Sequence, residues 1–178
     1  MSVVYPDLPD DVESTVVRDR RTDPERLVAR LQELGWTVGV AESLTGGLLI
    51  ASLVAVPGAS AVVRGGVVAY ATDVKHSLLG VDSGLLDAHG AVHPLVVGEM
   101  AEGVRIALSR DGHRCDLGIA TTGIAGPESP DGQPVGTVHI AVSTALGTRV
   151  ETLALDGSRE AIRAETVRAA LHLALDAL

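Results

Sequence analysis

The sequence contains no phenylalanine, one tryptophan and two tyrosines among its 178 residues, and its formal net charge is -9. Proteins that bind nucleic acids use basic faces to neutralise phosphates and aromatic side chains to stack on bases. The acidic, aromatic-poor composition therefore argues against a nucleic-acid ligand, although a single pocket can still be locally basic.

Cysteine is scarce and long apolar runs are missing. The single Cys115 excludes an intrachain disulfide and a zinc site built from cysteine pairs, and its place before an apolar run predicts a buried thiol. No apolar stretch approaches the roughly 20 residues of a membrane span, and the polar N-terminus lacks the core of a signal peptide. We therefore expect a cytoplasmic protein that does not associate with membranes.

The sequence also has no set of residues at the spacing typical of metal ligands. His89 and His93 are four residues apart, but Gly90 and Pro94 argue against a shared helix face, and no third ligand stands at a useful distance along the chain. We expect neither a metal nor a cofactor.

The length of the chain fits one domain. Residues 1–22 are charged and contain two prolines, and we expect an extension or a surface arm there. The folded domain is expected over residues 23–178, where Asp23 caps a first helix and Gly35 ends it.

The apolar pattern beyond this helix alternates between strands and helices and closes with a hairpin and a final helix. Strands are expected over 37–41, 62–71 and 115–120, a hairpin over 135–143 and 149–155, and helices over 48–56, 72–80, 94–109 and 158–178. This order predicts an α/β fold, a three-layer α/β/α domain with a mixed sheet.

Ser43 and Thr45 stand with Gly46 and Gly47 between a predicted strand and the next helix. Such strand exits form the ligand crevice of open α/β sheets. Free backbone amides at a helix start attract anions, and glycines let a ligand approach the backbone. No lysine follows the glycines, so the segment is not a P-loop. A capping segment without a ligand explains the same residues equally well.

Lys75 is the only lysine, while the other 13 basic residues are arginine. Arginine stays protonated, whereas a buried lysine can lose its proton and act as a base. Tyr70, one of the two tyrosines, offers a hydroxyl that can relay a proton. The alternative is a surface lysine and a tyrosine packed at a strand end.

A second strand exit carries Thr121 and Thr122, followed by Gly123 and Gly126. Hydroxyls and spaced glycines after a strand can form an anion-binding nest or an oxyanion hole. A tight turn without a ligand is the alternative. A Ser-His-Asp triad lacks the G-x-S-x-G elbow that would support it.

Several motifs resemble the CinA C-terminal domain family. They are AESLTGG at 41–47, VPGAS at 56–60, GGVVAY at 65–70, Lys75 with LLGV at 78–81, HGAV at 89–92, and TGIAGP at 122–127 followed by PVG at 134–136. Their order and spacing are kept from about residue 24 to the C-terminus. The chain is similar to the stand-alone form of this domain, without the molybdopterin-binding-like domain that many relatives carry before it.

The resemblance implies a nicotinamide-nucleotide amidohydrolase, which converts nicotinamide mononucleotide and water into nicotinic acid mononucleotide and ammonia and so recycles pyridine nucleotides. The family's nucleophile falls on Ser43, and its tyrosine and lysine fall on Tyr70 and Lys75. The family also favours a dimer. The residues expected to bind the substrate are Glu42, Thr45, Gly46, Gly47, Thr122, Gly123, Ile124, Ala125, Gly126, Arg159 and Arg163.

In the mechanism that we expect, neutral Lys75 takes the Ser43 proton directly or through Tyr70. The substrate phosphate is expected at the amides of residues 45–47, at Arg159 or at Arg163.

Three departures from the family pattern bear on this reading. Leu44 stands where relatives often have cysteine, His93 where serine is frequent, and residues 128–132 replace a more glycine-rich loop, which bears on substrate affinity. The alternative function is an inactive module that binds a nucleotide or a partner protein, in line with the family's link to competence and DNA damage. Another amidase that acts on a different carboxamide is a third hypothesis.

Overall fold

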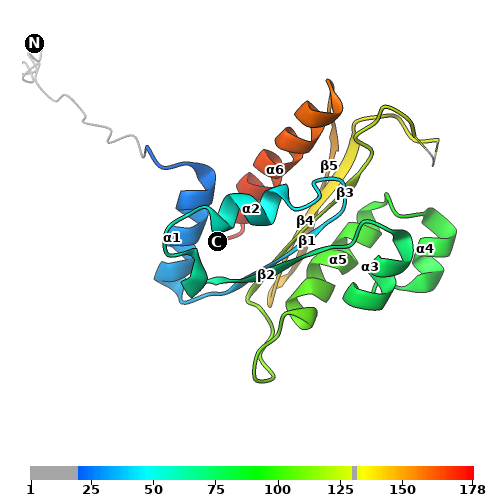
Figure 1. Cartoon of the computed structure of the whole chain (residues 1–178). Helices are drawn as coiled ribbons and strands as arrows, with labels where there is room; N and C mark the ends of the chain where they lie inside the picture. Colours follow the sequence, from blue (N-terminus) through cyan, green and yellow to red (C-terminus); the bar gives the residue numbers. More distant parts are fainter. Residues whose placement is uncertain (1–19, 130–131) are drawn as a thin grey trace, which may run out of the picture.

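The computed structural model describes residues 20–129 and 132–178 (Figure 1). The strands are β1 (Val38–Glu42), β2 (Val63–Val68), β3 (Leu117–Gly123), β4 (Thr137–Thr144) and β5 (Gly147–Ala154). The helices are α1 (Asp23–Leu34), α2 (Leu48–Val54), the 3-10 turn η1 (Ala59–Ala61), α3 (Thr72–Leu79), α4 (Ser83–His89), α5 (Pro94–Ala107) and α6 (Arg159–Asp176). Most of the extension expected over 1–22, and two residues of the 128–132 loop, lie outside the described residues.

The five strands form one mixed sheet in the order β2-β1-β3-β4-β5. β1 is parallel to β2 and β3, whereas β4 is antiparallel to β3 and β5. In the register, Glu42 at the end of β1 pairs with Val68 of β2 and with Thr121 of β3. The residues that follow these three strand ends therefore meet at one edge of the sheet.

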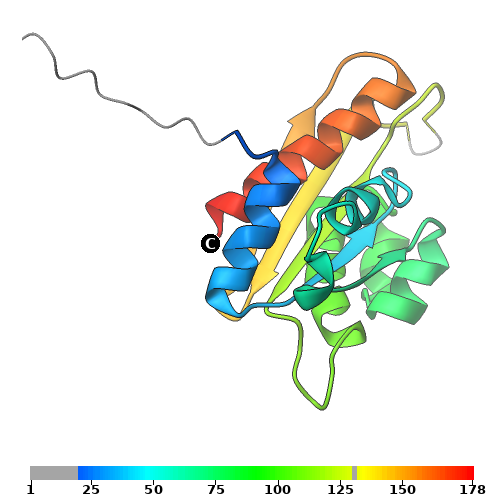
Figure 2. The same ribbon diagram turned by 60° about the vertical axis from the view of Figure 1, so that its left-hand side comes forward.

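Helices cover both faces of the sheet, which confirms the predicted three-layer α/β/α domain (Figures 1 and 2). α1, α2 and α6 pack on the face that carries Val38 and Val40 of β1. α3, α4 and α5 pack on the other face, with Ala41 of β1 and Ala120 of β3. Side chains alternate between the faces of a strand, so these short apolar strands supply both cores.

Glycine lets the α5 layer approach the sheet closely. A Cβ atom on Gly118 of β3 would lie 2.1 Å from the carbonyl oxygen of Ala101 in α5. A Cβ atom on Gly103 of α5 would lie 1.9 Å from the carbonyl oxygen of Leu79 at the end of α3. Any larger residue at either position would push these elements apart.

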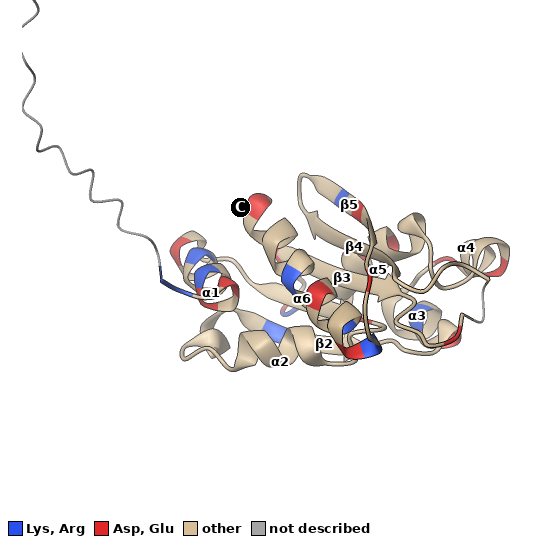
Figure 3. Cartoon of the chain, turned by 90° about the horizontal axis from the view of Figure 1, so that it is seen from above, with Lys and Arg blue, Asp and Glu red and all other residues tan. Residues whose placement is uncertain are grey.

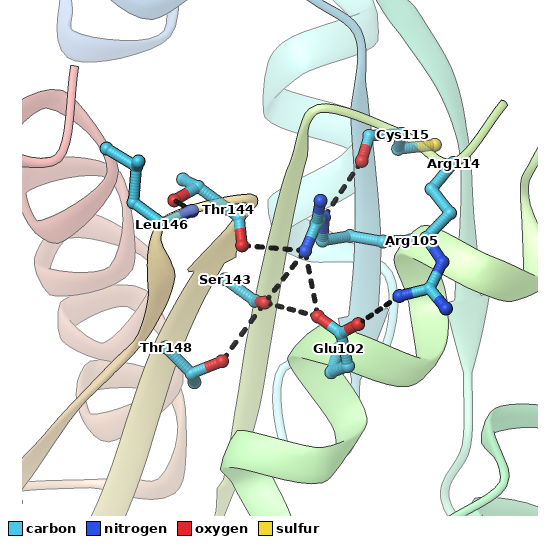
Figure 4. A network of polar contacts seen from close by, with 8 residues as sticks. All are labelled: Glu102, Arg105, Arg114, Cys115, Ser143, Thr144, Leu146 and Thr148. Carbon is cyan, nitrogen blue, oxygen red and sulfur yellow. Dashed lines mark hydrogen bonds and ion pairs between the residues drawn. The ribbon is translucent and has the colours of Figure 1, made fainter.

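A polar network joins α5 to β4 at the edge of the sheet opposite the ends of β1 and β3 (Figure 4). Arg105, which is buried, donates to the carbonyl oxygens of Cys115 and Thr144, each at 2.8 Å. Its guanidinium also pairs with Glu102 at 2.8 Å, and Glu102 accepts the Ser143 hydroxyl at 2.7 Å. Because each buried polar group has a partner, the network fixes α5 on the sheet.

Charged residues of both signs lie along α1 and α6 (Figure 3). The pairs there are exposed or half-exposed, such as His172 with Asp23 at 2.7 Å. None of the helices in the described ranges is both long and apolar enough to cross a membrane.

The structure corrects several boundaries. Thr22, not Asp23, caps α1, and its backbone N–H donates to Glu25 at 2.7 Å. Gly35 ends α1 in the left-handed conformation, as predicted (φ 66°). α4, which was not predicted, is seven residues long and begins at the cap Asp82, which accepts from the N–H of Leu85.

The end of β3 also differs from the prediction. Thr122 and Gly123, expected in a loop, belong to the strand because they pair with His139 and Val138 of β4. Cys115 is buried, as predicted.

Candidate active site

A cavity of about 550 Å³ opens at the edge of the sheet where β1 and β3 end. It is lined by the segment after β1, by Tyr70 and Thr72 after β2, by α4 and the loop after it, and by the loop after β3. The predicted site residues that line it are Ser43, Tyr70, Gly123, Ile124, Ala125, Gly126 and Arg159.

Another cavity, of about 440 Å³, opens at the opposite end of the strands, around Arg64, Arg110 and Arg114. None of the predicted catalytic residues lines it. We assign the candidate active site to the first cavity, because only that cavity contains Ser43 and lies at the carboxyl ends of parallel strands.

Lys75 and Ser43 are in contact beneath this cavity. Nζ of Lys75 lies 3.1 Å from Oγ of Ser43. The lysine side chain on α3 is fully buried, and Ser43 keeps 8% of its surface exposed. The serine is therefore the member of the pair that a ligand can reach.

The surroundings of Nζ make the neutral amine easier to form than that of an exposed lysine. Burial lowers the pKa of Lys75 from 10.5 to about 8. Nζ donates to the carbonyl oxygens of Ala69 at 2.7 Å and Tyr70 at 3.4 Å. Carbonyl oxygens only accept, so both N–H bonds of a neutral amine point at them, which leaves the lone pair for the hydroxyl of Ser43. That arrangement suits proton transfer from Ser43 to Lys75.

Tyr70 meets Lys75 through its main chain and not through its hydroxyl. The side chain is 62% exposed, and its Oη lies 3.4 Å from Nη2 of Arg159. The predicted proton relay through the phenol therefore has no hydrogen bond to support it in the described residues. Tyr70 instead forms part of the cavity wall beside Arg159.

Of the amides of residues 45–47 that were expected to bind phosphate, that of Gly47 is already bound by a side chain. The Glu42 carboxylate accepts hydrogen bonds from the backbone N–H groups of Gly47, Leu49 and Ile50, at 2.9, 3.1 and 2.8 Å. Glu42 is fully buried, and neither it nor Gly46 nor Gly47 is part of the cavity lining. The amides of α2 stabilise this carboxylate in place of a substrate anion.

The two predicted arginines have different surroundings. Arg159 lines the cavity, and its Nη1 donates to the carbonyl oxygen of Gly126 at 2.7 Å. Arg163 lies outside the cavity lining and donates to the carbonyl oxygens of Leu44 and Thr45, each at 2.9 Å. Only Arg159 faces the place where a substrate would lie.

The two predicted threonines also bind protein groups. Thr45 and Thr121 share a hydrogen bond between their hydroxyls at 2.9 Å. The hydroxyl of Thr122 donates to the carbonyl oxygen of Ala91 at 2.8 Å. Both Thr45 and Thr122 are fully buried and lie outside the cavity lining, so they shape the site without reaching a ligand.

Sequence reasoning missed part of the cavity wall. Leu44, Asp87 and the loop from Gly90 to Val92 line the cavity and were not assigned to the site. The HGAV motif at 89–92 was the available signal, but α4, which carries Asp87 and leads into that motif, was not predicted.

Among the described residues, backbone amides without an acceptor occur in the segment after Ser43 and in the loop after β3. Within residues 20–129 and 132–178, the N–H groups of Leu44, Thr45, Ala125 and Gly126 have no hydrogen-bond acceptor. Amides of this kind can stabilise an oxyanion that forms on a carbon attacked by Ser43. Across the same described ranges, no group of three or more His, Cys, Asp or Glu side chains could hold a metal ion.

Comparison with known proteins places the whole described domain in one family. The model of the CinA C-terminal domain matches residues 21–178. A CinA-like protein of Frankia casuarinae is 50% identical over 137 residues, which cover 77% of this chain and 30% of that protein. A CinA-like protein of an Anaeromyxobacter species is 47% identical over 152 residues, covering 84% and 36%. The chain thus spans about a third of the length of these curated relatives.

Solved structures of similar length share the fold. A competence-damaged protein (CinA) superfamily protein from Klebsiella pneumoniae has a TM-score of 0.81 at 33% identity, covering 86% of this chain and 94% of that one. The competence/damage inducible protein CihA from Agrobacterium tumefaciens has a TM-score of 0.77 at 37% identity, covering 88% and 97%.

Proposed function

Since the chain belongs to the CinA C-terminal domain family, we propose that it is an amidohydrolase that converts nicotinamide mononucleotide and water into nicotinic acid mononucleotide and ammonia. The observation that carries the proposal is the contact of 3.1 Å between Nζ of buried Lys75 and Oγ of Ser43 beneath the cavity. A serine next to a desolvated amine is an activated nucleophile, and acyl transfer is the chemistry that such a pair performs.

The first half of the reaction acylates the serine. Neutral Lys75 takes the hydroxyl proton while Oγ of Ser43 forms a bond to the carboxamide carbon, and the carbonyl oxygen becomes an oxyanion. The free amides of Leu44, Ala125 and Gly126, three residues that line the cavity, are the candidates to hold that charge. As the carbon–nitrogen bond breaks, the ammonium of Lys75 gives its proton to the leaving nitrogen, so ammonia departs and an ester to Ser43 remains.

The second half repeats the same proton movements with water. Lys75, neutral again, takes a proton from water, which attacks the ester carbon through its oxygen. The carbon–oxygen bond to Ser43 then breaks, and the proton returns from Lys75 to Oγ. Nicotinic acid mononucleotide leaves, and both residues regain their starting protonation states.

Arg159 is the proposed ligand of the substrate phosphate. Its guanidinium lines the cavity and lies between the carbonyl oxygen of Gly126 and the Tyr70 hydroxyl. Arginine presents several donors in a fixed plane, which suits a phosphate group.

Release of ammonia from nicotinamide mononucleotide tests the proposal. We expect Ser43→Ala to lower turnover by several orders of magnitude while the variant stays folded. Ser52→Ala is the matched control, because Ser52 lies on α2 and its hydroxyl donates to the backbone oxygen of Leu49. Full activity of the Ser43 variant would remove the serine from the mechanism.

The same assay separates the other hypotheses. Binding of nicotinamide mononucleotide without ammonia release supports a nucleotide-binding module, and turnover of another carboxamide alone supports a different amidase. The dimer that the family favours is a separate proposal, which light scattering in solution tests.

A further inference from the structure

We propose that Glu42 and Arg163 are positioning residues, which hold Ser43 against Lys75 and orient the amides beside it. The proposal rests on the function proposed above. It assigns to both residues a role other than the substrate contact expected from the sequence. The part of the chain on which they act is Ser43 to Gly47, called here the nucleophile segment.

Glu42 links the two ends of the nucleophile segment by hydrogen bonding. The residue directly precedes Ser43, and its carboxylate accepts from the N–H of Gly47 at the other end of the segment, at 2.9 Å. It also accepts from the amides of Leu49 and Ile50, so both carboxylate oxygens are bound to α2. Because the carboxylate is fully buried and held by three amides, the turn between β1 and α2 has little freedom.

Arg163 holds the segment from α6. Its Nε and Nη2 donate to the carbonyl oxygens of Leu44 and Thr45, each at 2.9 Å. In a planar trans peptide the N–H points away from the C=O, so a bound Leu44 oxygen fixes the direction of the Thr45 N–H. This N–H is one of the amides without a protein acceptor in the described ranges.

The remaining peptide groups of the segment are held as well. The N–H of Ser43 donates to the carbonyl oxygen of Thr121 at 3.0 Å, and the N–H of Gly46 donates to the carbonyl oxygen of Ser43 at 3.2 Å. The latter bond orients the Leu44 peptide, whose N–H also lacks an acceptor in the described ranges. Glu42 and Arg163 thus complete a frame that sets both Oγ of Ser43 and the free amides.

Lysine at position 163 distinguishes positioning from phosphate binding. Lysine carries a single charged point and cannot reproduce two fixed, parallel donors, whereas it serves well as a phosphate ligand. Nicotinamide riboside, which lacks the phosphate, provides the second distinction. Loss of a phosphate ligand affects only the phosphorylated substrate, while loss of positioning affects both substrates by the same factor.

The experiment compares kcat and KM of Arg163→Lys, Arg163→Met and Glu42→Gln on the mononucleotide and on the riboside. Small misplacements of reacting groups reduce rates by up to about 100-fold, so we expect kcat to fall about 10- to 100-fold in all three variants. The KM values should stay within about threefold, and the factor should be equal for both substrates. In Glu42→Gln the amide NH₂ group would face backbone donors, which breaks the cap.

Arg168→Lys is the matched control for the lysine variant. Arg168 lies on α6 as well, but it pairs with Glu165 on the exposed surface, so its replacement should leave kcat unchanged. Arg159→Met provides the contrast, because it should raise KM for the mononucleotide only. Melting temperatures confirm that each variant is folded at the assay temperature.

Two results overturn the proposal. One is normal kcat in folded Glu42→Gln. The other is a normal kcat in Arg163→Lys together with a KM of Arg163→Met that is raised for the mononucleotide but not for the riboside. That result would show that Arg163 is a phosphate ligand. If the wild type releases ammonia from neither substrate, the proposed function is wrong. The positioning role can then still be tested without turnover, by the rate at which a fluorophosphonate labels Ser43. Labelling at least tenfold slower in these variants supports positioning, and equal rates refute it.

Discussion

Burial of Lys75 should make the stability of the fold depend on pH, and Lys75→Met should remove that dependence. The lysine has a pKa of about 8 in the folded chain because it is buried, and 10.5 is its ordinary value. Between these two values the unfolded chain binds more protons than the folded chain, so the free energy of unfolding rises with pH. Below pH 8 the folded protein carries the full penalty of a buried charge, and above pH 10.5 the penalty is gone.

The size of the effect follows from the two pKa values. One pKa unit corresponds to about 1.4 kcal/mol, so the difference between 10.5 and about 8 corresponds to roughly 3 kcal/mol. The hydrogen bonds from Nζ to Ala69, Tyr70 and Ser43 offset part of the penalty, and the methionine variant loses them. The informative quantity is therefore the change with pH and not the absolute stability.

Urea unfolding from pH 7 to pH 11 measures this change for the wild type and for Lys75→Met. Other titrating groups are common to both chains and cancel in the difference. We expect the variant's stability relative to the wild type to decrease by about 3 kcal/mol across this range. Leu79→Met, on the same helix and also buried, is the control whose offset should not change with pH. Parallel curves for Lys75→Met and the wild type would refute the lowered pKa and, with it, the basis of the base assignment.

Three further predictions concern activity and the polar network. Lys75→Arg should lower kcat nearly as much as Lys75→Met, because arginine keeps its proton. The wild-type rate should fall on the acid side of about pH 8, where Lys75 becomes protonated. Near-normal turnover of the arginine variant would contradict the role of Lys75 as a base. Chelators should leave ammonia release unchanged, since the described residues hold no group of three metal-ligating side chains; loss of activity that zinc or manganese restores would argue against the serine mechanism. Arg105→Met should lower the free energy of unfolding by about 2–4 kcal/mol without changing kcat, because it removes the donor to the carbonyl oxygens of buried Cys115 and half-buried Thr144. Urea unfolding measures that loss.

The features that sequence predicted well are those set by local pattern and composition. The order of strands and helices follows from apolar periodicity, and it led to the three-layer domain with a mixed sheet. The status of Lys75 as the single lysine indicated either a buried base or a surface residue, and the structure buries it against Ser43. Both inferences needed only residue types and their order along the chain.

The features that sequence missed depend on partners far away along the chain. Arg163 was one of the candidates for the substrate phosphate because that group needs a positive site, whereas the acceptors that it binds in the structure, at Leu44 and Thr45, lie 119 and 118 residues away. Thr122 was placed in a loop, whereas pairing with His139 of β4 extends β3 through it. No local pattern carries information of this kind.

The position of the Glu42 carboxylate explains why no charged partner opposes the lowered pKa of Lys75 beneath the cavity. A buried carboxylate that paired with Lys75 would favour the ammonium form and raise its pKa. Instead the carboxylate is bound by the amides of Gly47, Leu49 and Ile50, whose aligned dipoles stabilise the negative charge. Lys75 meets only uncharged acceptors, so burial alone determines its pKa, and burial lowers it. The start of α2 thus affects the site indirectly, since it binds the one fully buried carboxylate among the described residues and leaves Lys75 with uncharged partners only, as the proposed proton exchange with Ser43 requires.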